Sequence, residues 1–119
     1  MGNPKLIVDG GSFPPPAIKD VAPDDDRTIL VKGDNDVSHN PAEVVVNRSV
    51  TFFPLFSNQS ITITFNGSNP FGWSSNTRAG VQGKPLKVTG LPKTYYYEAR
   101  LKTTASAVSG SYPLQLVVK

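Results

Sequence analysis

The stretch YYYEARLKTTASAVSGSYPLQLVVK, residues 95–119, decides the fold, because apolar residues recur at every second position in two of its segments. In residues 95–101 the members of one face are Tyr95, Tyr97, Ala99 and Leu101. In residues 112–118 the corresponding members are Leu114, Leu116 and Val118. A period of two is typical of a half-buried β-strand. The stretch therefore predicts two strands that close the chain and share a core.

The same pattern extends toward the N-terminus. Residues 60–65, SITITF, alternate cleanly, and shorter apolar segments occupy 28–32, 43–46, 49–53 and 84–88. No helix-period segment of ten residues is present. The chain is therefore predicted to be all-β, an antiparallel Greek-key β-sandwich. The pair NR between 43–46 and 49–53 forms either a tight turn or a bulge, or the two segments are one bent strand. The residues expected in the core are Ile63, Phe65, Tyr97, Ala99, Leu116 and Val118.

The chain of 119 residues has the length of one ordinary domain. Residues 28–119 are predicted to form the single sandwich domain. Residues 1–27 differ from it, because the segment 10–27 holds four prolines and an acidic triplet. This Pro/Asp-rich leader is expected to be a surface arm, with KLIV at 5–8 as an edge strand, or to be disordered in part.

The charges are unevenly distributed. Residues 1–43 hold eight acids and four bases, a net −4, and residues 44–119 hold eight bases and one acid, a net +7, which together give the net +3. The bases stand singly, a pattern that argues against nucleic-acid binding. No apolar run approaches the length of a membrane span. The first residues lack the features of a signal peptide. The compartment is therefore left open, and a periplasmic or secreted location is expected only if a signal was removed.

Two blocks resemble a cupredoxin, the blue-copper fold. The block at 43–65, EVVVNRSVTFFPLFSNQSITITF, is similar to the front half of that family, and the block at 91–119 is similar to its back half. The resemblance spans residues 28–119 and rests on strand order and on the spacing of the aromatic pair Tyr95 and Tyr97. An immunoglobulin-like sandwich is the alternative fold.

The resemblance also locates the positions where the family carries copper ligands. Ala99 falls at the cysteine position, Gln59 or Ser60 near the first histidine, Thr103 or Thr104 near the second, and Val108 near the methionine. The chain has no cysteine and one histidine. Because a blue-copper site needs a thiolate and two imidazoles, copper electron transfer is excluded and no cofactor is expected.

Residues 66–83 are predicted to be a long polar loop that carries the candidate ligand-binding residues. Phe71 and Trp73 stand two apart among turn-forming residues, and Arg78 follows. Aromatic side chains on a sandwich loop can stack on a sugar or a base, with arginine assisting. Tyr96 is the fourth candidate, on the outer face of its strand. The favoured reading of Phe71 and Trp73 is nevertheless that they cap the end of the core.

Two weaker candidate sites lie in DNDVSHNP, residues 34–41. Asp34, Asp36 and Ser38 present oxygens at every second position, as calcium loops do, but the glycine and the glutamate of such loops are missing. Hydrogen bonding within a turn is the favoured reading of these residues. His39 is the single histidine, and its neighbours in sequence do not imply a catalytic triad.

The predicted function is therefore a non-enzymatic, copper-free cupredoxin-like binding or assembly module, with a protein partner favoured. A carbohydrate-binding module that uses Phe71, Trp73 and Tyr96 is the first alternative. A minor hydrolase is the second, and it is disfavoured because acid–base chemistry usually draws on histidine or paired carboxylates. Residues 44–119 hold one acid, Glu98.

Overall fold

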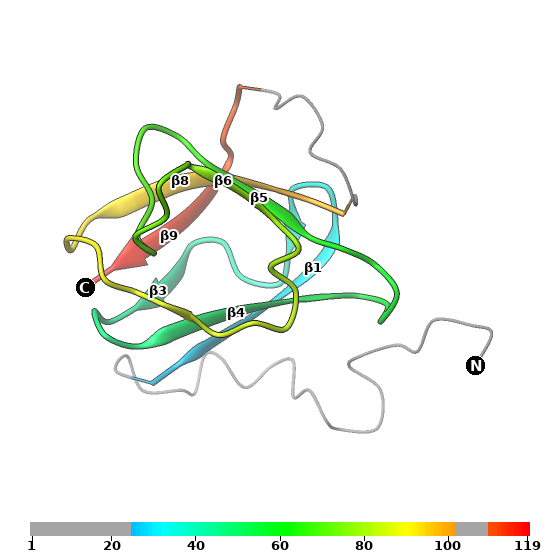
Figure 1. Cartoon of the computed structure of the whole chain (residues 1–119), viewed down its shortest axis with the longest axis horizontal. Helices are drawn as coiled ribbons and strands as arrows, with labels where there is room; N and C mark the ends of the chain where they lie inside the picture. The colour runs from blue at the N-terminus through cyan, green and yellow to red at the C-terminus, as the bar shows by residue number, and fades with distance from the viewer. Residues whose placement is uncertain (1–24, 102–109) are drawn as a thin grey trace.

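The structure is a computed structural model that describes residues 25–101 and 110–119 (Figure 1). Within these residues the chain forms strands and no helix. The strands are β1 Arg27–Gly33, β2 Asp36–Val37, β3 Ala42–Val44, β4 Ser49–Pro54, β5 Thr62–Phe65, β6 Thr77–Ala79, β7 Leu86–Lys87, β8 Thr94–Arg100 and β9 Leu114–Val118. Residues 1–24 of the predicted leader lie outside the described residues, and so does the edge strand expected at 5–8.

The strands form two sheets that pack against each other. One sheet has the order β2-β1-β4-β7 and the other the order β3-β9-β8-β5-β6. Figure 1 shows β1 and β4 in one layer and β5, β8 and β9 in the other. The predicted all-β sandwich is confirmed.

Most neighbouring strands pair antiparallel, including the two closing strands β8 and β9, in which Tyr95 lies opposite Leu116. Two pairs are parallel, namely β1 with β4 and β3 with β9, so both sheets are mixed and the prediction of wholly antiparallel pairing is wrong. A parallel neighbour requires a crossover connection. Here the chain leaves β1, contributes β3 to the other sheet, and returns as β4 in the direction of β1.

The NR pair predicted between two strands makes a tight turn that transfers the chain between the sheets. The N–H group of Arg48 donates to the carbonyl of Val45 at 3.1 Å, and Asn47 has a φ of 78°. Asparagine adopts this left-handed conformation more readily than most residues with a side chain. The turn thus separates β3 from β4, and the alternative of one bent strand is wrong.

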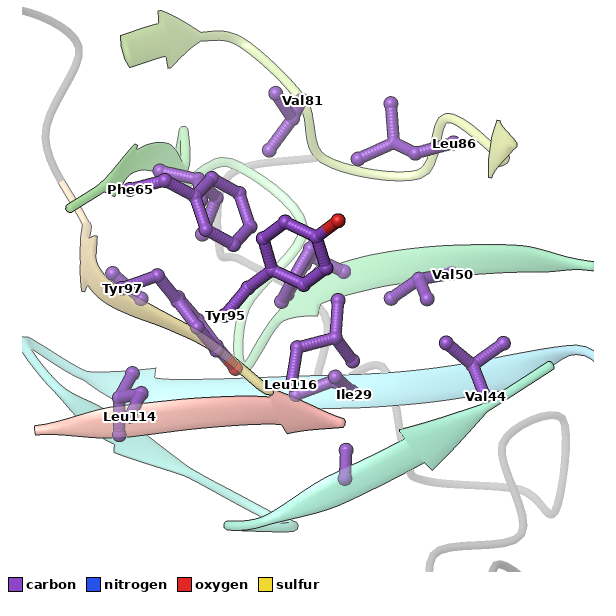
Figure 2. Packing of buried hydrophobic residues seen from close by; sticks show 14 of the residues in the cluster. Ile29, Val44, Val50, Phe65, Val81, Leu86, Tyr95, Tyr97, Leu114 and Leu116 are labelled. Carbon is purple, nitrogen blue, oxygen red and sulfur yellow. The ribbon is translucent and has the colours of Figure 1, made fainter. Parts of the chain in front are cut away.

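The core lies between the sheets, and Figure 2 shows its side chains converging from both of them. The ring of Tyr97 lies 5.8 Å from that of Phe52 in the opposite sheet and 5.4 Å from that of Phe65 beside it. All six residues predicted for the core are buried, namely Ile63, Phe65, Tyr97, Ala99, Leu116 and Val118. The alternating pattern therefore predicted correctly which face of these strands is buried.

Two strands escape prediction from the sequence, β2 and β6. β6 lies within residues 66–83, which were expected to form one loop, and its residue Arg78 pairs with Ile63 of β5. The expectation of an uninterrupted loop is therefore wrong, and the irregular connection runs over 66–76. A strand of three residues without apolar alternation has no signal in the sequence, because its pairing with β5 defines it.

The outer face of the five-stranded sheet holds a buried acid. Glu98 alternates with the core residue Tyr97 and so points outward, yet its side chain is fully buried. One carboxylate oxygen accepts from Arg100 Nη2 at 3.1 Å, and the other accepts from the N–H groups of Gly110 and Tyr112 at 3.1 and 3.2 Å. Burial of a carboxylate is tolerated when charge and hydrogen bonds compensate it. The chain at Gly110 is thus tied over this face.

Candidate functional site

The connection between β5 and β6, residues 66–76, is organised by one side chain, that of Asn69, and is called the aromatic loop below. Asn69 Oδ1 accepts from the N–H groups of Phe71 and Trp73 at 3.1 and 3.0 Å. Its Nδ2 donates to the carbonyl of Trp73 at 3.1 Å and to Asn76 Oδ1 at 2.9 Å. Four bonds from one side chain fix the backbone on both sides of the two aromatic residues.

The aromatic loop places Phe71 and Trp73 over the edge of the core. The Trp73 ring lies 5.1 Å from that of Phe71 and 5.9 Å from that of the buried Phe65. Both loop residues are half-buried and pack against the core cluster. The guanidinium carbon of Arg78 lies 5.0 Å from the centre of the Trp73 ring, a cation–π contact. Three of the four predicted ligand-binding residues are therefore brought together here.

The turn between β7 and β8, residues 88–93, packs directly beside the aromatic loop. The carbonyl of Pro70 accepts from the N–H groups of Thr89 at 2.8 Å and Gly90 at 3.0 Å. A Cβ atom at Gly90 would lie 2.9 Å from Pro70 Cα and 2.5 Å from the hydroxyl oxygen of Tyr95. Contacts this short leave no room for a side chain, so glycine is required for the close approach. We call residues 66–76 and 88–93, together with Arg78 of the adjoining strand β6, the loop platform.

Tyr95 holds the second turn of the loop platform in place. Its hydroxyl donates to the carbonyl of Leu91 at 2.8 Å. Burial raises the pKa of Tyr95 above its ordinary value, so the hydroxyl stays protonated and remains a donor at neutral pH. Leu91 itself is 75% exposed, and it is therefore an apolar side chain displayed on a turn whose backbone is anchored.

Two cations flank the aromatic cluster of the loop platform. Lys93 Nζ lies 5.0 Å from the centre of the Tyr95 ring, and the Tyr95 ring lies 6.4 Å from that of Phe65. Arg78 lies over the ring of Trp73, which in turn contacts Phe65. Neither cation forms an ion pair within the described residues. The sequence holds no acid between Glu43 and Glu98.

Tyr96, the fourth predicted residue, lies apart from the other three. It is 46% exposed, and it pairs with Gln115 on the outer face of the five-stranded sheet. Arg78 pairs with the buried Ile63 and therefore projects to the other face of that sheet. The side chain of Tyr96 thus lies on the opposite face of the sheet from that of Arg78, although the Tyr96 carbonyl accepts from the N–H of Asn66 at 2.9 Å.

The predicted calcium oxygens are engaged by different partners. Asp34 accepts from the N–H of Leu101 at 3.0 Å and from Arg100 at 3.4 Å, and Asp36 lies 3.8 Å from Lys32. Ser38 Oγ accepts from the N–H of Leu30 at 2.9 Å. Within residues 25–101 and 110–119, no three acidic, histidine or cysteine side chains gather as a group that would hold a metal ion.

His39 lies beside Ser38, whose Oγ is 2.7 Å from His39 Nδ1. Burial lowers the pKa of His39, and the positive charges of Arg27 and Lys32 lower it further. The imidazole is therefore mainly neutral at neutral pH, and its tautomer sets which of Nδ1 and Ser38 Oγ is the donor. Because Ser38 Oγ also accepts from the backbone of β1, the pair fastens the chain that follows β2 to that strand.

Of the six residues that the cupredoxin resemblance assigned to the four copper-ligand positions, three are described. Ala99 is buried, and its N–H donates to Asn35 Oδ1 at 2.9 Å. Gln59 Oε1 accepts from the N–H of Phe56 at 3.1 Å, and Ser60 Oγ lies 3.4 Å from Gln82 Oε1. The positions Thr103, Thr104 and Val108 lie outside the described residues.

Sequence reasoning missed Asn69, Leu91 and Lys93 as contributors to this site. Asn69 belongs to the segment NPFGW, where an asparagine before proline signals a turn, so its organising role had a local signal. Leu91 and Lys93 lie about 20 residues further along the chain. The position of their turn beside the aromatic loop depends on the contact of Gly90 with Pro70, and no local pattern encodes that contact.

Comparisons with protein families, with curated proteins and with solved structures find no match to this chain. The class of protein that the structure defines is therefore an all-β sandwich with two mixed sheets and an ordered loop platform at one end. No helix long and apolar enough to cross a membrane occurs in the described part of the chain.

Proposed function

We propose that this protein is a non-enzymatic binding or assembly module whose binding site is the loop platform. The observation that supports it is the Asn69-centred hydrogen-bond set, which holds Phe71 and Trp73 in fixed positions at the surface. A loop ordered in advance loses little conformational entropy on binding. Binding sites in sandwich proteins are commonly built from loops on such a rigid scaffold.

The frame of this module is proposed to be a copper-free cupredoxin-like sandwich. The parallel pairs β1–β4 and β3–β9 favour it over an immunoglobulin-like sandwich, whose two sheets are antiparallel. The chain has no thiolate and only one imidazole, so the proposed sandwich would function without a blue-copper site. Function in such a frame resides in the site that the loops build.

A protein partner is favoured over a saccharide because of Arg78. Its guanidinium occupies a face of the Trp73 ring on which a sugar would stack. Tryptophan, tyrosine and arginine are also the residues that contribute most often to protein–protein binding energy. A carbohydrate-binding module remains the alternative function, because Phe71 and Trp73 are half-buried and so still present part of their rings to solvent.

The test compares the wild-type chain with Trp73→Ala and Arg78→Gln, after thermal melting shows that each variant folds. Each is used as bait for capture from an extract of the source cells, and each is run in affinity gels that contain polysaccharides. We expect a protein that binds the wild type, rebinds it after purification, and is lost with both variants. Retardation by a polysaccharide that Trp73→Ala abolishes would support the carbohydrate alternative. Equal binding by all three chains would contradict a function at this loop.

A further inference from the structure

The loop platform carries apolar and positively charged side chains but no acidic ones, and this composition indicates the kind of partner. Its apolar side chains are the exposed Leu91 and the half-buried Phe71 and Trp73. Its rim carries Arg78 and Lys93, and no acid is present in residues 66–97. Because no carboxylate within the described residues pairs with either cation, both positive charges remain available to a ligand.

We infer that the loop platform docks an acidic protein segment that carries an apolar side chain, with the apolar side chain on Leu91 and Phe71 and carboxylates at Arg78 and Lys93. This inference rests on the proposed function and names its class of partner. Each cation already lies 5.0 Å from an aromatic ring centre, over Trp73 and Tyr95 respectively. The charged groups are thus held near their binding positions, and little side-chain entropy is lost when a carboxylate arrives.

Rigidity favours a defined segment as the occupant. Leu91 is displayed by a turn that two hydrogen bonds to Pro70 and one from Tyr95 fasten to the sandwich. An exposed apolar residue on a fixed backbone, surrounded by polar and charged groups, is the arrangement of an interface anchor. The backbone that carries Leu91 is therefore held in place before a partner binds.

The other anionic partners fit less well. Nucleic acid is bound by neutralising many phosphates, which requires a denser set of bases than the two on this rim. Anionic membranes are bound by clusters of about four to eight lysines or arginines. Two cations around an apolar centre match the scale of a peptide segment instead.

The test uses fluorescein-labelled peptides of about a dozen residues with one central leucine or tryptophan among glutamates. Matched peptides replace each glutamate by glutamine, or the apolar residue by serine. Anisotropy is measured with the full chain at low and high salt. We expect the acidic apolar peptides to bind, and each replacement to weaken binding by about tenfold or more, which corresponds to about 1.4 kcal/mol. Binding should also weaken as salt screens the charges.

Variants of the protein localise the effect. Leu91→Ser and Lys93→Gln should each weaken binding of the acidic peptide, and Lys93→Gln should also reduce its salt dependence. Both residues are exposed, so neither change threatens the fold. The matched control is Lys84→Gln, which removes an exposed cation outside the loop platform and should leave binding unchanged.

Three results would overturn the inference. The first is equal binding of glutamate and glutamine peptides. The second is binding that Leu91→Ser does not alter. The third is binding only to phosphatidylserine vesicles or to a single-stranded oligonucleotide. If the peptides fail while Trp73→Ala still abolishes binding of a captured protein or a polysaccharide, the proposed function stands and the partner class is wrong. If Trp73→Ala and Leu91→Ser change no binding at all, both proposals fail.

Discussion

Asn35 and Ala99 exchange two hydrogen bonds across the two sheets of the sandwich. The N–H of Asn35 donates to the carbonyl of Ala99 at 2.8 Å, and the N–H of Ala99 donates to Asn35 Oδ1 at 2.9 Å. Ala99 lies beyond the last pair of the β8–β9 ladder, Tyr97 with Leu114. The turn after β1 therefore takes the place of a strand partner, and it joins the four-stranded sheet to the end of β8.

This link predicts that Asn35→Ala destabilises the protein by about 1–3 kcal/mol, because the buried N–H of Ala99 loses its acceptor. Asn35 also has a φ of 55°, which alanine adopts at a cost. Asn35→Gly keeps the backbone conformation and removes only the side-chain acceptor, so it should cost less. Denaturant unfolding measures both variants. Equal stability of Asn35→Ala and the wild type would show that the link contributes nothing.

Leu116→Ala should cost about 2–5 kcal/mol, because Leu116 is fully buried between the sheets and its loss leaves a cavity. Leu91→Ala is the matched control. It removes the same atoms from a side chain that is 75% exposed, and it should change stability by less than about 0.5 kcal/mol. Thermal and denaturant melting of the two variants provide the comparison. Similar losses at both positions would contradict the described register of β9.

The hydroxyl of Tyr97 is buried and finds no hydrogen-bond partner in the described part of the chain. Tyr97→Phe removes this polar group and keeps the ring contacts with Phe52 and Phe65. We expect the free energy of unfolding to be unchanged or to rise by about 1 kcal/mol, because an unpaired buried hydroxyl costs free energy. A loss of more than about 1 kcal/mol would instead show that the hydroxyl is bonded.

Alkaline pH should destabilise the protein, because Tyr97 ionises more readily in the unfolded chain than in the folded chain. Burial raises the pKa of Tyr97 well above the ordinary value of 10.0. The unfolded chain then releases the phenolic proton near pH 10 while the folded chain retains it. The free energy of unfolding is therefore unaffected by Tyr97 ionisation below about pH 10. Above that pH it decreases by about 1.4 kcal/mol per pH unit for this one group. Tyr97→Phe should reduce this slope in denaturant unfolding series, and an unaltered slope would assign it to other groups.

Asn69→Ala should release the aromatic loop without unfolding the sandwich. All four side-chain bonds of Asn69 are made within residues 69–76. We expect the Trp73 emission to shift to the red and its quenching by iodide to increase, with near-native thermal stability. Asn69→Asp retains the acceptor for Phe71 and Trp73 but loses the two donated bonds, so it should have an intermediate effect. Wild-type emission from both variants would show that the loop is ordered by other contacts.

The sequence by itself determined the sandwich and the inward face of its principal strands. Ile63, Tyr97 and Leu116 belong to segments that alternate strictly, and because side chains of a strand point to opposite sides in turn, local order is sufficient to assign their burial. The absence of cysteine likewise excluded blue copper without any structure. The grouping of Phe71, Trp73 and Arg78 was also accessible, since the three lie within eight residues.

The tertiary structure alone decided what depends on contacts distant in sequence. The burial of the outward-facing Glu98 requires Gly110 and Tyr112 to fold over it, and the parallel pairs require the chain to change sheets at Asn47. Contacts between remote segments also decide that Tyr96 lies apart from Trp73, and that the turn which carries Leu91 lies beside the aromatic loop. Local periodicity states which face a residue occupies in its own strand. It does not predict which other segment packs against that face, because contacts between elements distant in the sequence determine that neighbour.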